Sequence, residues 1–166
     1  MKYRKHEKYP EVKVERKNTE YARLLMHAYA GSISEETAIH QYLFQNMVLP
    51  DEMNEERKIL QGIAIVEMHH LKLLGELIKK LGVYPIYADC SSKSVDFWNA
   101  ESVDYEVFYE NMLIANIKAE KEAIKDYRLL MNVIDDCYIK EILSCIIDDE
   151  EVHVEIFTNL LNQLDS

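Results

Sequence analysis

Residues 35–42 read Glu-Glu-Thr-Ala-Ile-His-Gln-Tyr, and residues 120–127 read Glu-Lys-Glu-Ala-Ile-Lys-Asp-Tyr. Both stretches follow the pattern Glu-x-x-Ala-Ile-x-x-Tyr. Each is followed by a Glu-x-x-His motif, at residues 67–70 and 150–153. The chain therefore carries the same pair of motifs twice, which predicts two similar halves.

The spacing of these motifs predicts a metal site. Residues three or four apart on a helix share a face, so the glutamate and histidine of each Glu-x-x-His motif point the same way. Four buried carboxylates would repel one another strongly, whereas two divalent cations would neutralise them. Carboxylates with two imidazoles suit iron or manganese, and the absence of thiolates argues against a structural zinc site. The predicted metal ligands are Glu35, Glu67, His70, Glu120, Glu150 and His153.

The choice of Glu35 depends on the repeat. The two stretches align Glu35 with Glu120, which leaves the adjacent Glu36 as the alternative ligand. Tyr42 and Tyr127 lie two helical turns after Glu35 and Glu120. We expect each tyrosine to be buried with its hydroxyl bonded to a site carboxylate, where it would serve proton or electron transfer during catalysis.

Helix signals divide the chain into four long segments. The first predicted helix runs from Thr19 to about Val48 before Pro50, and the second runs from a cap at Asp51 to Leu81, where Gly82 stops it. The other two run from about Val103 to Ile134 and from about Cys137 to Leu164. Residues 82–102 show no helical period and are expected to form a crossover. The prediction is an all-α protein, an antiparallel four-helix bundle over residues 19–166 made of two hairpins.

The charge, the apolar segments and the cysteines of the chain indicate which partners and which location to expect. The net charge of −11 disfavours nucleic acid and anionic membranes as partners. Residues 1–18 form a basic arm, which we expect to pack on the bundle or on a neighbouring subunit. No apolar segment resembles a signal peptide or a membrane span, and the three cysteines show no Cys-x-x-Cys spacing. These features favour a cytoplasmic location, and they exclude a four-cysteine rubredoxin-type iron site from this chain.

The two Glu-x-x-Ala-Ile-x-x-Tyr segments and the two Glu-x-x-His pairs resemble the ferritin-like superfamily, most closely its rubrerythrin and bacterioferritin branch. The resemblance covers about residues 19–164. It implies a di-iron carboxylate centre with Glu35 and Glu120 as ligands from the first and third helices. It also implies Glu67 and Glu150 as bridging carboxylates and His70 and His153 as terminal ligands, one for each metal.

This chain differs from the rubrerythrin branch in two features that bear on its function. This chain lacks a rubredoxin domain, and no acidic residue lies one turn from Glu120. The leading hypothesis is therefore a di-iron oxidoreductase that reduces hydrogen peroxide or dioxygen with electrons from an external donor, such as a rubredoxin-type protein. The alternatives are manganese-catalase-like peroxide disproportionation, an iron-binding or storage protein, and a structural coat protein with a vestigial site. We expect a homodimer, because the basic arm and the acidic body are complementary.

Overall fold

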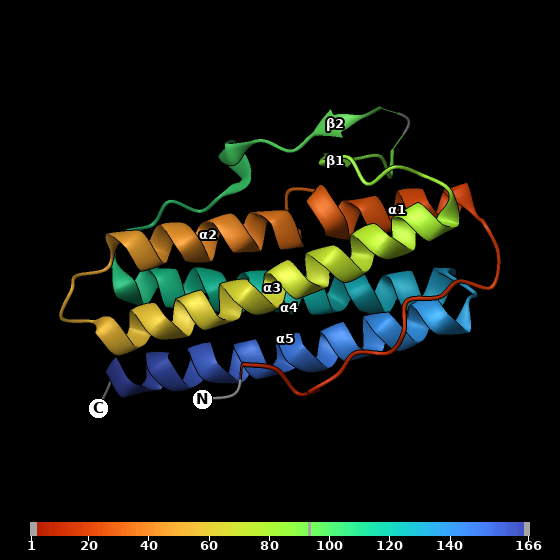
Figure 1. Cartoon of the computed structure of the whole chain (residues 1–166). Coiled ribbons are helices and arrows are strands. Elements are labelled where there is room, and N and C mark those ends of the chain that lie inside the picture. Colours follow the sequence, from red (N-terminus) through yellow and green to blue (C-terminus); the bar gives the residue numbers. More distant parts are fainter. Residues whose placement is uncertain (1–2, 93, 165–166) are drawn as a thin grey trace.

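The computed structural model describes residues 3–92 and 94–164. These form an antiparallel four-helix bundle in which two shorter helices, α1 and α2, together occupy the first position (Figure 1). The all-α bundle predicted from the sequence is confirmed. The helices are α1 (Thr19–Ala30), α2 (Glu35–Val48), α3 (Asn54–Leu81), α4 (Tyr109–Val133) and α5 (Cys137–Leu164).

The prediction of one continuous first helix is wrong at residues 31–34, where the chain breaks between α1 and α2. Ser34 caps α2 by accepting a hydrogen bond from the backbone N–H of Thr37, while its own hydroxyl donates to the Gly31 carbonyl at 2.7 Å. A Cβ at Gly31 would lie 2.6 Å from the His27 carbonyl oxygen, so the tight approach requires glycine. The break makes Glu35 the first residue of α2.

Helix α3 ends as predicted and begins later than predicted. Gly82 follows Leu81 in the left-handed conformation, with φ of 103°, and donates its N–H to the carbonyls of the last turn. The predicted cap at Asp51 is wrong: the helix begins at Asn54, and the Asp51 carboxylate instead pairs with Arg57 at 2.5 Å. The bounds of α5 agree with the prediction.

The crossover is longer than predicted, because α4 begins at Tyr109 and not at Val103. The Glu106 carboxylate accepts hydrogen bonds from the backbone N–H groups of Val107 and Phe108, which holds this stretch outside the helix. The crossover also contains a two-stranded antiparallel sheet and a 3-10 turn, neither of which was predicted. These are β1 (Ala88–Asp89), β2 (Asp96–Phe97) and the turn Ala100–Ser102.

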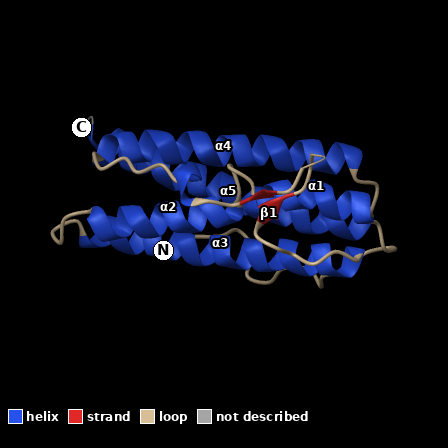
Figure 2. Ribbon diagram, turned by 90° about the horizontal axis from the view of Figure 1, so that it is seen from above, coloured by secondary structure: helices blue, strands red, loops and turns tan. Residues whose placement is uncertain are grey.

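The crossover lies over α1 and α2 (Figures 1 and 2). The Trp98 indole N–H donates to the Thr37 hydroxyl at 2.9 Å, and the backbone N–H of Asp104 donates to the Gln41 side chain at 3.1 Å. Both bonds join the crossover to α2 just after Glu35. The crossover therefore fixes the start of α2.

The described part of the basic arm runs along the opposite side of the bundle, beside α5 (Figure 1). The backbone N–H of Lys5 donates to the Asp149 carboxylate at 2.5 Å, and that of Glu15 donates to the Asp136 carboxylate at 2.8 Å. At its end, the N–H of Asn18 donates to the Leu81 carbonyl at 3.1 Å. The arm thus packs on the bundle of its own chain.

Two buried apolar clusters fill the bundle, and the predicted metal ligands lie between them. One includes Leu25, Leu74, Leu77, Ile139 and Ile142, and the other includes Leu60, Ile63, Met112, Leu113 and Phe157. Both clusters join residues from several helices, and their apolar burial supplies most of the driving force for folding. Within the described residues, no helix is long and apolar enough to cross a membrane.

Candidate metal centre

Four helices carry the six predicted ligands to one place in the middle of the bundle. The structure brings all six together, each of them at most 3% exposed. They form two groups that share two glutamates, and within a group the potential ligand atoms lie within 4.8 Å of one another. The groups are Glu35, Glu67, His70 and Glu150, and Glu67, Glu120, Glu150 and His153.

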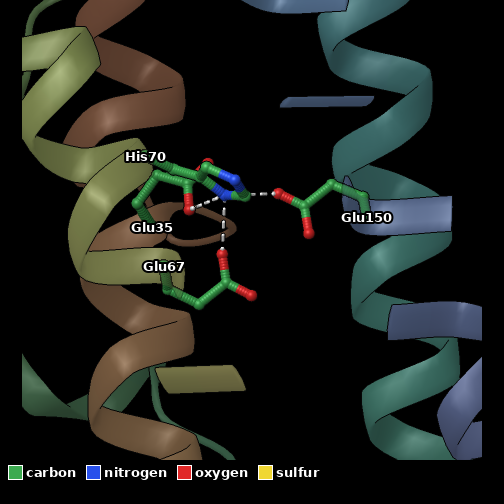
Figure 3. Close-up of side chains that lie close together, drawn as sticks. All are labelled: Glu35, Glu67, His70 and Glu150. Carbon is green, nitrogen blue, oxygen red and sulfur yellow. Dashed lines mark hydrogen bonds and ion pairs between the residues drawn. The ribbon is translucent and has the colours of Figure 1, made fainter. Parts of the chain in front are cut away.

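The first group surrounds Nδ1 of His70 (Figure 3). This atom lies 3.0 Å from Glu67 Oε2 and 3.1 Å from Glu150 Oε1. It also lies 3.6 Å from Glu35 Oε2. One nitrogen and three carboxylate oxygens from α2, α3 and α5 therefore converge on this position.

The second group repeats this arrangement around Nδ1 of His153. This atom lies 2.8 Å from Glu150 Oε2 and 3.0 Å from Glu67 Oε1, the other oxygens of the two shared carboxylates. Its third neighbour is Glu120 Oε1 at 3.6 Å. Because Glu67 and Glu150 each offer one oxygen to each group, both have the geometry of bridging carboxylates.

Electrostatics make the cluster unfavourable without cations. Burial and the neighbouring carboxylates raise the pKa of Glu120 to about 8, and burial raises the pKa of Glu35 well above its ordinary value. Burial alone would lower the pKa of His70 and of His153, but the surrounding carboxylates raise both. Burial opposes ionisation of Glu67 as well, yet the attraction of the two neighbouring histidines, His153 first, lowers its pKa. The raised pKa values of the non-bridging glutamates and of both histidines favour bound protons at this cluster. Divalent cations would neutralise the same negative charge.

One atom supports this interpretation directly. Glu67 Oε1 is buried and makes no hydrogen bond of good geometry to the described residues, although Nδ1 of His153 lies 3.0 Å away. A buried carboxylate oxygen without a hydrogen bond is rare and costly in a protein, and a bound metal ion would satisfy its lone pair. The oxygen-rich donor set with two imidazoles suits a pair of iron or manganese ions.

The two predicted catalytic tyrosines are buried, and each bonds to a glutamate of the other half. The Tyr42 hydroxyl donates to Glu120 Oε1, and the Tyr127 hydroxyl donates to Glu35 Oε1. Burial, and then the nearby carboxylates, raise the pKa of both phenols well above the ordinary value. Both hydroxyls therefore remain protonated donors that hold the non-bridging glutamates in place.

The hydrogen-bond partners of the outer ring nitrogens, Nε2, of His70 and His153 were not predicted from the sequence. Nε2 of His70 donates to Asp149 Oδ2 at 3.2 Å, and Nε2 of His153 donates to the Tyr3 carbonyl at 2.9 Å. A partner on the outer nitrogen fixes the ring and leaves Nδ1 free to bind metal. Asp149 lies on the buried stripe of Ile146 and His153, so helical periodicity could have found it.

The remaining polar side chains lie outside the two groups. Glu36, the alternative to Glu35, is in neither of them, and its side chain is 12% exposed. His40 and His69 are exposed, as predicted. The repeat thus selected the glutamate that points inward.

A cavity of about 100 Å³ adjoins the cluster at the break between α1 and α2. Glu35 and Glu120 line it, together with both tyrosines. Small side chains form much of the rest of the wall, among them Ala28, Ala38, Ala119, Ala123, Ser32 and Ser34. A cavity of this size has room for a molecule of a few heavy atoms.

Comparison with known families adds an independent observation. A family model described as manganese containing catalase matches residues 1–83, which is half of the 166 residues. The chain belongs to the manganese-containing catalase family. The matched residues, 1–83, include the basic arm and the predicted ligands Glu35, Glu67 and His70.

Individual proteins similar to this chain include manganese catalases. A probable manganese catalase from Clostridium acetobutylicum is 26% identical, over 96% of this chain and 80% of the relative. The crystal structure of KatB, a manganese catalase from Anabaena PCC7120, superposes with a TM-score of 0.87 at 26% identity and covers 100% of this chain and 82% of that one. These similarities favour manganese over the predicted iron.

A more distant similarity concerns the fold alone. Desulfovibrio desulfuricans bacterioferritin matches with a TM-score of 0.73 at 24% identity, over 89% of this chain and 84% of that chain. Together with the manganese catalase structure, it confirms the predicted ferritin-like fold. The chain is a ferritin-like di-metal carboxylate protein of the manganese catalase type.

Proposed function

We propose that this protein disproportionates hydrogen peroxide into water and dioxygen at a dimanganese centre. The observation that carries the proposal is the pair of shared glutamates, Glu67 and Glu150, joining two histidine groups in a chain of the manganese catalase family. One peroxide takes up two electrons and two protons to give two water molecules. A second gives up two electrons and two protons to give dioxygen, so no external donor is needed.

The chain's side chains have distinct roles in this proposal. Glu35 and His70 would hold one ion, Glu120 and His153 the other, with Glu67 and Glu150 bridging. Bound manganese would supply the reversible two-electron change.

Tyr42 and Tyr127 orient the non-bridging glutamates at the wall of the cavity. The cavity admits a molecule the size of peroxide, and the predicted apolar wall beside the site keeps bulk water out. That wall comprises Ile39, Ile63, Leu71, Ile124 and Ile146, all buried or half-buried.

The donor-dependent di-iron peroxidase that leads the sequence predictions is not confirmed, because the family match favours its manganese-catalase alternative. The external electron donor, the homodimer, the cytoplasmic location and the division into arm and bundle stay predictions from the sequence.

An oxygen electrode tests the proposal. Protein loaded with Mn(II) should release one dioxygen for every two peroxides consumed, in the absence of any reductant. Metal-free protein and the variant Glu67→Ala serve as controls and should release none. Peroxide consumption that requires an added electron donor and releases no dioxygen would instead support the peroxidase hypothesis and overturn the proposal.

A further inference from the structure

The start of the basic arm lies against the outer side of both predicted metal-ligating histidines. We propose that the segment Tyr3–Tyr9 positions these two rings, with Tyr9 acting through Asp149 on His70 and the Tyr3 carbonyl acting directly on His153. The inference rests on the proposed dimetal centre. It adds a positioning element that belongs to none of the four bundle helices.

On the His70 side, the arm holds Asp149 from two directions. Asp149 is fully buried, and its Oδ2 accepts from His70 Nε2 at 3.2 Å and from the Tyr9 hydroxyl at 2.5 Å. Its Oδ1 accepts from the backbone N–H of Lys5 at 2.5 Å. A carboxylate held by two other donors cannot turn away from the imidazole, so the arm fixes the His70 ring through it.

The Tyr9 ring adds a steric constraint on the same imidazole. It meets the His70 ring edge-on, with centroids 6.0 Å apart and planes at 81°. Tyr9 therefore restrains both the partner of Nε2 and the tilt of the ring. The hydroxyl alone can be tested by Tyr9→Phe, because the ring is retained.

On the His153 side, the arm supplies a backbone group. A carbonyl oxygen can only accept, so the 2.9 Å contact between Tyr3 O and His153 Nε2 requires the proton on Nε2. With Nε2 holding its proton, Nδ1, which faces Glu67 and Glu150, is the nitrogen that would give up its proton to a bound cation. The Tyr3 carbonyl thus presents the nitrogen that the second ion needs.

Gly62 on α3 provides the seat for Tyr3. A Cβ added to this glycine would lie 2.2 Å from the Tyr3 ring. Glycine inside a helix is less favourable than alanine, so helix propensity alone would favour Gly62→Ala. The substitution should instead displace Tyr3 and its carbonyl from His153.

The arm also offers a matched control. His6 Nε2 lies 2.7 Å from Asp148 Oδ2, in the same segment and against the same helix. The His6–Asp148 pair is part-exposed and touches neither His70 nor His153 in the described contacts. His6→Ala therefore removes an arm contact of similar length without altering either outer partner.

The test measures retention of manganese in the full chain. Wild type, Tyr9→Phe, Gly62→Ala, the double variant and His6→Ala are loaded with Mn(II) and dialysed against a chelator. Manganese per chain is counted, and electron paramagnetic resonance separates coupled pairs from single ions. We expect Tyr9→Phe and Gly62→Ala each to hold one of the two ions about 10- to 100-fold more weakly and to lose the coupled signal. The double variant should lose both ions, and His6→Ala should keep both.

Three outcomes would overturn the inference. The first is retention of both ions in Tyr9→Phe and Gly62→Ala at the wild-type rate. The second is an equal loss in His6→Ala, which would indicate a general effect of arm packing. The third is a lower Tm of the metal-free variants with both ions retained, which would indicate a purely structural role. Wild-type protein that binds no manganese would overturn the proposed function as well, so the two failures are distinguishable.

Discussion

Each site residue depends on a partner from the other half of the chain. Tyr127 holds Glu35, Tyr42 holds Glu120, and Asp149 holds His70. The cross-bonding means that neither half completes its own group. Changes at residues that belong to one group only, or at their partners, should therefore affect one ion while leaving the bundle folded.

The neighbouring glutamates at the start of α2 give a direct comparison. Glu35→Gln should lose the ion beside His70, because the amide has no negative charge with which to bind a cation. Glu36→Gln should retain both ions, because Glu36 lies outside the two groups. Manganese per chain, measured after gel filtration, decides between them. Loss of an ion from Glu36→Gln alone would show that the repeat selected the wrong glutamate.

Ala119 tests the role of the cavity. A leucine at this position would extend into the cavity of about 100 Å³ that Glu120 also lines. We expect Ala119→Leu to keep two manganese ions and to release dioxygen from peroxide at least about tenfold more slowly. Ala115→Leu, one turn earlier on α4 and outside the cavity wall, is the matched control. An unchanged rate in Ala119→Leu would exclude this cavity as the substrate site.

Periodicity and repetition predicted the inner residues and missed the outer ones, for a physical reason. Glu67 and His70 are close because they are three positions apart on one helix, which the sequence records directly. The bond from Lys5 to Asp149 joins residues 144 positions apart, and the acceptor from Tyr3 is a backbone carbonyl with no sequence signature. Contacts of this kind depend on how the arm docks and not on any local pattern.

At the scale of elements, the break between α1 and α2 opens the cavity and places Glu35 at a helix start. A continuous helix was predicted because the apolar positions before and after the break keep a helical spacing. Gly31 and Ser34 carried the opposing signal, a close approach followed by an N-cap. The late start of α4 has a similar origin, since Glu106 caps the backbone locally.

The crossover hairpin is anchored to α1 by an acid-sensitive pair. His27 Nδ1 lies 2.7 Å from Asp89 Oδ2, and Asp89 Oδ1 accepts from the Ser91 N–H. Burial opposes ionisation of Asp89, but these bonds outweigh it and lower its pKa below the ordinary 3.8. A lowered carboxyl pKa contributes stability at higher pH, which is lost as pH falls below about 4.

Asp89→Asn should therefore reduce the pH dependence of stability. Metal-free wild-type protein should exceed the variant in unfolding midpoint at about pH 6. The difference should shrink at about pH 3.5, because Asp89 takes up a proton more readily in the unfolded chain than in the folded pair, which favours unfolding. Urea denaturation at the two pH values measures this. A difference that stays constant, or grows on acidification, would show that the pair does not anchor the hairpin through charge.

At the scale of the whole molecule, two apolar clusters enclose a polar layer that the fold cannot stabilise by itself. Four carboxylates and two imidazoles meet there, each of them buried. Such an arrangement is costly unless cations occupy it. The bundle, the crossover and the arm each contribute to holding this layer in place from a different side.

The measurement that tests the central claim most directly is the metal content of the protein purified from its own source. Inductively coupled plasma analysis should find about two manganese ions per chain, with little iron. Two irons per chain would contradict the choice of metal and return the di-iron peroxidase to first place. No metal, even after Mn(II) loading, would contradict the dimetal centre itself.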